Sequence, residues 1–191
     1  YALLPRRAGR AMSGSGMPAS LPSREVHCAE ALAWLRERGC VAGACAVTSL
    51  PDVSEVNLGL EAWRSWFLGA VGAVVEAVPA NQAAVFFQSD IRHGGRWVDK
   101  GALVVRAAED AGAGVLFHKI VSRRPPGMVT TGRPGFTHLI AVSRDLRCTG
   151  PLAIPDIIVD PGRQPWVRAM GVKAAAYAVR FARDQAAARV I

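Results

Sequence analysis

Short apolar segments alternate with amphipathic helical segments along residues 25–191. The clearest strand is 83–88, a continuous apolar run of the kind that is buried on both faces of a parallel sheet. The clearest helix is 60–78, where Trp63, Phe67 and Val71 recur at helical spacing. This alternation predicts a doubly wound α/β fold, with a mostly parallel sheet and helices on both of its faces.

The rest of the stretch keeps the same alternation. We expect further strands at 25–28, 41–48, 115–121, 136–143 and 189–191. We expect further helices at 29–38 and 166–187, and one that is capped by Asp99 and ends at Ala111. Turn-forming residues predict loops at 52–59, 89–97 and 122–135, and an irregular segment at 145–162.

Length and composition are those of an ordinary globular protein. The 191 residues, 51% hydrophobic and 20% charged, suffice for one domain with a sizeable core. No apolar run is long enough to cross a bilayer, so we expect no membrane span. Residues 1–24 hold four arginines and no acid and are rich in Pro, Gly and Ser, which predicts a disordered basic N-terminal segment. The folded domain is then 25–191.

The formal net charge of +8 is unevenly distributed. Residues 111–144 hold one lysine and four arginines without any Asp or Glu. Such a block predicts an anionic partner, most commonly nucleic acid. The basic loop at 121–135 combines arginines with prolines and glycines, which suits phosphate contacts. The alternatives are a solvated surface loop and the arginine-rich composition of a GC-rich genome.

Neither the cysteines nor the histidines show metal-ligand spacing. Cys28 and Cys45 lie in apolar segments, so we expect buried, reduced thiols, which favours a cytoplasmic location. The four histidines are too scattered to predict a metal site.

The strand at 41–48 ends in Thr48, Ser49, Leu50, Pro51 and Asp52. In an open α/β sheet, ligands bind at the carboxyl ends of the strands. A proline there stiffens the turn and leaves flanking carbonyls able to accept a hydrogen bond from a ligand's amino group. Asp52 could hold a cation or accept a proton. The alternative is a plain strand-ending turn with a solvated Asp. Polar residues 88–90, at the end of the next strand, could line the same crevice or simply cap a loop.

The order of these features resembles that of the permuted Rossmann-like methyltransferases that use S-adenosylmethionine, a group that contains the amino-methylating DNA enzymes. Those enzymes carry an acidic residue near a helix, then an (Asp/Ser/Thr)-(Ser/Pro)-Pro-(Tyr/Phe) tetrapeptide, and later an Asp-Pro-Phe-x-Gly-x-Gly cofactor loop. Here Glu30 stands at the acidic position. Residues 117–119 resemble an aromatic-His-Lys segment before the target-recognition loop, and 164–181 resembles the approach to the cofactor strand.

The resemblance implies a methyltransferase with S-adenosylmethionine as cofactor and nucleic acid as substrate. The implied catalytic residues are Ser49, Leu50, Pro51 and Asp52. The implied cofactor-binding residues are Glu30, Thr48, Gln164 and Trp166. The implied substrate-binding residues are His118, Lys119, Arg123, Arg124 and Arg133.

The chain departs from the pattern of that group in two places. Leu50 and Asp52 replace the second and fourth residues of the tetrapeptide, and the fourth is the aromatic residue that stacks on a flipped base. No Asp-Pro-Phe-x-Gly follows residues 189–191, from which we expect a partial domain that lacks its main cofactor loop. A catalytically inactive nucleic-acid-binding domain of the same fold, and a methyltransferase for a small molecule or protein, are the alternatives.

Overall fold

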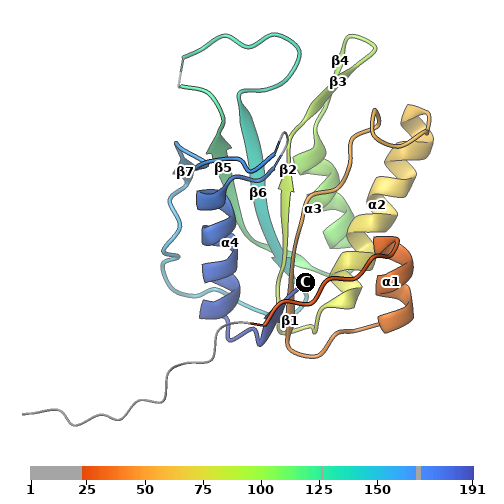
Figure 1. Ribbon diagram of the computed structural model, residues 1–191, viewed down its shortest axis with the longest axis vertical. Helices are drawn as coiled ribbons and strands as arrows, with labels where there is room; N and C mark the ends of the chain where they lie inside the picture. The colour runs from red at the N-terminus through yellow and green to blue at the C-terminus, as the bar shows by residue number, and fades with distance from the viewer. Residues whose placement is uncertain (1–22, 126, 167–168) are drawn as a thin grey trace, which may run out of the picture.

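The computed structural model describes residues 23–125, 127–166 and 169–191 (Figure 1). The predicted N-terminal segment, 1–24, lies almost wholly outside these residues. A six-stranded sheet with the order β7-β5-β6-β2-β1-β8 forms the centre of the molecule. Its strands are β1 (Ala44–Thr48), β2 (Ala84–Gln88), β5 (Gly114–Ser122), β6 (Phe136–Ser143), β7 (Ile157–Ile158) and β8 (Arg189–Val190).

The sheet is mostly parallel, as predicted. β1 runs parallel to β2 and to β8, and β5 runs parallel to β7. β6 alone is reversed, antiparallel to both β2 and β5. β1 and β2 therefore end at the same edge of the sheet, which is where an α/β fold places its ligands.

Helices cover both faces (Figure 1). They are α1 (Ala31–Arg38), α2 (Leu60–Ala77), α3 (Lys100–Asp110) and α4 (Val172–Asp184). Trp63, Phe67 and Val71 of α2 pack with Phe86 and Ile140 in one core cluster, which also takes in α1 and α3. The second cluster lies under α4, where its buried residues meet the opposite sheet face. The alternation of strands and helices thus gives the predicted three layers.

Four predictions about local structure need correction. Residues 25–28 form no strand, and Cys28 is exposed, whereas Cys45 is buried in β1 as expected. Residues 89–97 are not a loop: β3 (Ile91–His93) and β4 (Arg96–Val98) form a hairpin, because Gly94 and Gly95 supply the two positive φ angles of a tight turn.

The other two concern ends of elements. The last helix begins at Val172 and not at 166, since Gly171, with φ of 88°, stands at its start. The basic loop is shorter than 121–135, because β5 continues to Ser122.

Among the described residues, no helix is both long and apolar enough to cross a membrane.

Candidate functional site

A cavity of about 570 Å³ lies at the carboxyl ends of β1 and β2. Thr48, Ser49, Leu50, Pro51 and Asp52 all line it, so the strand end singled out in the sequence faces a hollow. The other side of the cavity comes from distant segments, and includes Lys100, Arg123, Arg133 and Trp166. A hollow of this size is in the range of small-molecule and cofactor sites.

Asp52 lies at the centre of an ion-pair network. Its Oδ1 is 2.8 Å from Nζ of Lys100, and its Oδ2 is 3.3 Å from Nη2 of Arg133. The backbone beside it is also engaged: Lys100 Nζ donates to the Leu50 carbonyl at 3.1 Å, and Trp63 Nε1 donates to the Pro51 carbonyl at 3.2 Å. The turn is therefore fixed from two helices and is not a solvated strand end.

Lys100 is 2% exposed and lies over the rings of Trp63 and Phe67. Burial lowers the pKa of Lys100 from its usual value, and the hydrogen bond and charge of Asp52 oppose that shift. A carboxylate at position 52 thus has a structural reason here. Its negative charge compensates the positive charge of Lys100, which burial has removed from water.

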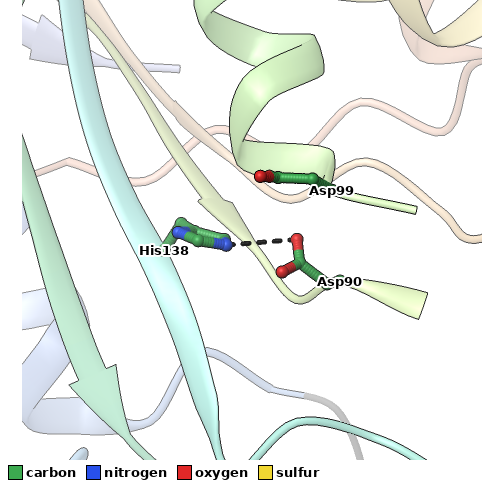
Figure 2. Close-up of side chains that lie close together, drawn as sticks. All are labelled: Asp90, Asp99 and His138. Atoms are coloured by element: carbon green, nitrogen blue, oxygen red, sulfur yellow. Dashed lines mark hydrogen bonds and ion pairs between the residues drawn. The ribbon is translucent and has the colours of Figure 1, made fainter. Parts of the chain in front are cut away.

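A second cluster holds the start of α3 in place (Figure 2). Asp90 accepts from His138 Nε2 at 3.1 Å, from the Lys100 backbone N–H at 2.8 Å and from Trp97 Nε1 at 3.1 Å. Burial alone would raise the pKa of Asp90, but His138 and these other donors outweigh it, so the pKa is lowered. Asp99 caps the helix by accepting from Ala102 N–H at 2.8 Å, as predicted.

Asp90, Asp99 and His138 also bring one potential metal-ligand atom each within 4.8 Å of one another. The sequence predicted no metal site, and the scattered histidines gave no indication of this cluster. Each oxygen of Asp90 already accepts a hydrogen bond from the chain. We therefore assign the cluster to positioning α3, and with it Lys100.

His118 faces this cluster and not the cavity. Its Nε2 is 2.8 Å from Nδ1 of His138. Burial, and then the neighbouring His138, lower the pKa of His118. Lys119 pairs with Asp156 and likewise lies outside the cavity lining. These two predicted substrate-binding residues are thus not brought to the cavity.

The basic loop reaches the cavity through two of its three arginines. Arg123 and Arg133 line it, and Arg123 Nη1 is 3.4 Å from Ser89 Oγ. Burial, followed by the like charges of Arg133 and Arg124, lowers the pKa of Arg123. Arg124 is exposed beside them. Three guanidinium groups that repel one another form a site that an anion would stabilise.

Of the four predicted cofactor-binding residues, two line the cavity and two do not. Thr48 and Trp166 line the cavity. Gln164 does not, and donates to the Ala169 carbonyl at 2.6 Å. Glu30 caps α1 by accepting from the N–H groups of Leu32 and Ala33, which lower its pKa.

A second cavity of about 640 Å³ adjoins the first, since Val47, Thr48 and Leu50 line both. It extends over α1 and past β8 to Ile191. Trp34 lies in its wall, and the buried Nε1 of Trp34 has no hydrogen-bond partner among residues 23–125, 127–166 and 169–191. This orphaned donor suits a hydroxyl or ring nitrogen of a bound molecule.

Gln88 and Ser89, which the sequence placed at the end of the second strand, line the cavity as expected. Sequence reasoning missed Lys100 and the charged face of the β3–β4 hairpin. One feature of the sequence could have indicated Lys100. A lysine in the first turn of a helix is unfavourable next to the positive end of the helix dipole, which suggests that it has a specific anionic partner. The hairpin carries exposed Arg92, Arg96 and Trp97. It projects from the same end of the molecule as the basic loop (Figure 1).

No protein-family model matches the chain, and no curated protein matches it either. Solved structures do match. The candidate DNA modification methylase TTHA0409 from Thermus thermophilus, complexed with S-adenosyl-L-methionine, gives a TM-score of 0.57 at 16% identity over 80% of this chain and 71% of that chain. The cytosine-N4-specific PvuII DNA methyltransferase gives 0.56 at 10% identity over 73% of this chain and 58% of that one.

A selenomethionine structure of TTHA0409 gives a TM-score of 0.49 at 16% identity, over 65% of this chain and 54% of that chain. The chain therefore spans between roughly half and about seven tenths of the length of these three structures. At these identities the likeness establishes the fold. The chain has the Rossmann-like α/β fold of the DNA methyltransferases, as its sequence predicted.

Proposed function

We propose that this chain contributes to methyl transfer from S-adenosylmethionine to an amino group of nucleic acid, with DNA as the first substrate to test. The observation that carries the proposal is the cavity at the carboxyl ends of β1 and β2. It joins the Ser49–Asp52 turn to the arginines of the basic loop on a methyltransferase fold. PvuII DNA methyltransferase and TTHA0409, both DNA-modifying by name, share that fold.

The residues present fit the cofactor. The two adjoining cavities meet at Thr48 and Leu50, and together offer an aromatic residue, Trp166, in one and the unused Trp34 N–H in the other. When bound, S-adenosylmethionine supplies an electrophilic methyl group. Thr48 and Trp166 are the residues that would hold it, while Glu30 and Gln164 act through the α1 cap and the approach to α4.

Within the site, each group of residues has a separate part. Ser49 and the turn that it opens orient the acceptor amine, and Lys100 keeps that turn in shape through Asp52. Arg123, Arg124 and Arg133 hold phosphates, while His118 and Lys119 brace the strand that leads into the loop. Catalysis of this kind depends mainly on positioning. A reducing compartment such as the cytoplasm fits the four free cysteines, all of which lie in described positions.

The alternative is a domain that binds nucleic acid without methylating it. The double ion pair of Asp52 favours this alternative, because both carboxylate oxygens are held by the chain's own cations. A measurement of methyl transfer distinguishes the two functions, whereas a measurement of nucleic-acid binding does not, because both functions include binding.

The test is transfer of an isotope-labelled methyl group from S-adenosylmethionine to duplex and single-stranded DNA, together with calorimetric titration of the cofactor. We expect cofactor binding and label in DNA. A Thr48→Val/Trp166→Ala variant should weaken cofactor binding. Salt-dependent DNA binding without label supports the binding-only domain, and label absent from DNA but present in small molecules overturns the nucleic-acid substrate.

A further inference from the structure

Gln88 is the last residue of β2, lines the cavity and is 1% exposed. Neither its Oε1 nor its Nε2 has a hydrogen-bond partner within the described residues, 23–125, 127–166 and 169–191. A buried carboxamide without partners is costly, because its donor and its acceptor have both lost water. A fold that keeps such a group at a cavity wall is expected to use it for a ligand.

The polar atoms of the adjoining residues Leu50, Pro51 and Asp52 already have partners inside the chain. The carbonyls of Leu50 and Pro51 accept from Lys100 and Trp63. Both carboxylate oxygens of Asp52 face cations. Each of these oxygens thus already accepts a hydrogen bond or faces a cation, whereas both polar atoms of Gln88 are unpaired and place an acceptor beside a donor.

The position of Gln88 is fixed by the sheet. Its backbone lies opposite His138 of β6, and the preceding Phe86 and Phe87 are buried in the two cores. A side chain that is already buried loses little conformational freedom when a ligand binds. The carboxamide is thus preorganised to recognise a planar group.

We propose that Gln88 recognises the acceptor base through an edge where an amino group stands beside an unprotonated ring nitrogen. Its Oε1 accepts from the amino group, and its Nε2 donates to the ring nitrogen. Cytosine and adenine both present such an edge, and thymine, which has a carbonyl in place of the amino group, does not. This inference rests on the proposed function, in which the acceptor is an amino group of nucleic acid.

The experiment compares the wild-type chain with Gln88→Leu, which removes both polar atoms at similar size, and Gln88→Glu, which keeps the shape without the donor. Gln82→Leu is the matched control, because Gln82 is also a buried glutamine but donates to the Gln185 carbonyl at 3.2 Å, away from the cavity. Affinities for dCMP, dAMP and dTMP are measured by calorimetry, and folding by urea unfolding.

We expect the wild type to bind dCMP or dAMP about tenfold more tightly than dTMP. Gln88→Leu and Gln88→Glu should lose that preference and leave dTMP binding unchanged. Gln88→Leu should unfold at an equal or higher urea concentration, because it removes an unpaired polar group. Gln82→Leu should keep the preference. The comparison of the two preferred nucleotides identifies which base is read.

A wild type without preference overturns the inference, as does a Gln88→Leu variant that keeps it. A large loss of stability in Gln88→Leu, with the preference intact in Gln88→Glu, overturns it as well, because Gln88 would then be structural. Cofactor titration separates this failure from failure of the proposed function. Binding of S-adenosylmethionine with no nucleotide preference removes only the role of Gln88.

Discussion

Lys100 is the residue that most changes how the strand end is understood. Read locally, Asp52 is a solvated carboxylate after a proline. In the structure it lies at the end of an ion pair that spans 48 positions of the chain, with Lys100 buried over two aromatic rings. Attraction between buried charges only offsets their lost hydration, so the pair serves to fix the turn more than to add stability.

Removing Lys100 should be much worse than removing Arg133, the other cation that faces Asp52. Lys100→Met leaves Asp52 buried beside a half-exposed Arg133, and we expect a loss of about 3 kcal/mol of unfolding free energy. Arg133→Gln removes the other cation, whose side chain is 46% exposed, and should cost at most about 1 kcal/mol. Urea unfolding followed by tryptophan fluorescence measures both. Equal losses in the two variants would show that Lys100 is not the main partner of Asp52.

Two basic segments, a loop and a hairpin, project from the same end of the molecule (Figure 1). One is the loop after β5, which the charge pattern predicted. The other is the β3–β4 hairpin, where the sequence predicted a loop although Gly94 and Gly95 between two short segments are a known hairpin signal. Trp97 ties this hairpin to the β2–α3 corner through its hydrogen bond to Asp90. The hairpin is therefore linked through Asp90 to Lys100, which lines the cavity.

If the hairpin contacts phosphates, Arg92→Gln/Arg96→Gln should weaken DNA binding and make it less sensitive to salt. The loss of two phosphate contacts lowers the slope of log affinity against log salt by about 1.8. Arg180→Gln, which removes an exposed charge from α4, is the control and should leave the slope unchanged. Affinities at several salt concentrations give the slopes. An unaltered slope in the double variant would place the hairpin outside the interface.

On the scale of the whole molecule, the first three residues of β1, Ala44 to Ala46, are buried within the sheet. This strand lies between β2 and β8, and its Cys45 is fully buried. Burial raises the pKa of Cys45 to about 11. At pH 8 the reactive thiolate would then be about 0.1% of the thiol, and access would still require the sheet to open.

The four cysteines should therefore react with a thiol reagent at three different rates. Cys28 and Cys40 are exposed and should react in native buffer, and the partly buried Cys148 more slowly. Cys45 should react only as the protein unfolds. A variant with Cys28, Cys40 and Cys148 changed to Ser isolates this signal, and its reaction rate is followed against urea. Modification of Cys45 in native buffer at the rate of Cys40 would contradict the central position of β1.

The sequence by itself determined the layers and the strand end at which the cavity lies. Apolar runs such as 83–88, the spacing of Trp63, Phe67 and Val71, and the cap at Asp99 are set by neighbours a few positions away, so they can be read along the chain. The same holds for the strand end at Thr48–Asp52. Errors arose at ends of elements, as at Gly171, where tertiary contacts decide how far a helix runs.

Only the tertiary structure decided which side chains meet at that strand end. The Lys100–Asp52 pair, the bond from His138 to Asp90 and the unpaired carboxamide of Gln88 each depend on groups brought together from different strands and helices. Hydrophobic periodicity in the sequence indicates which face of a helix or strand is buried. It does not indicate which residue of another element is buried against that face. For charged and polar groups, that partner decides whether burial is stable and whether a ligand is needed.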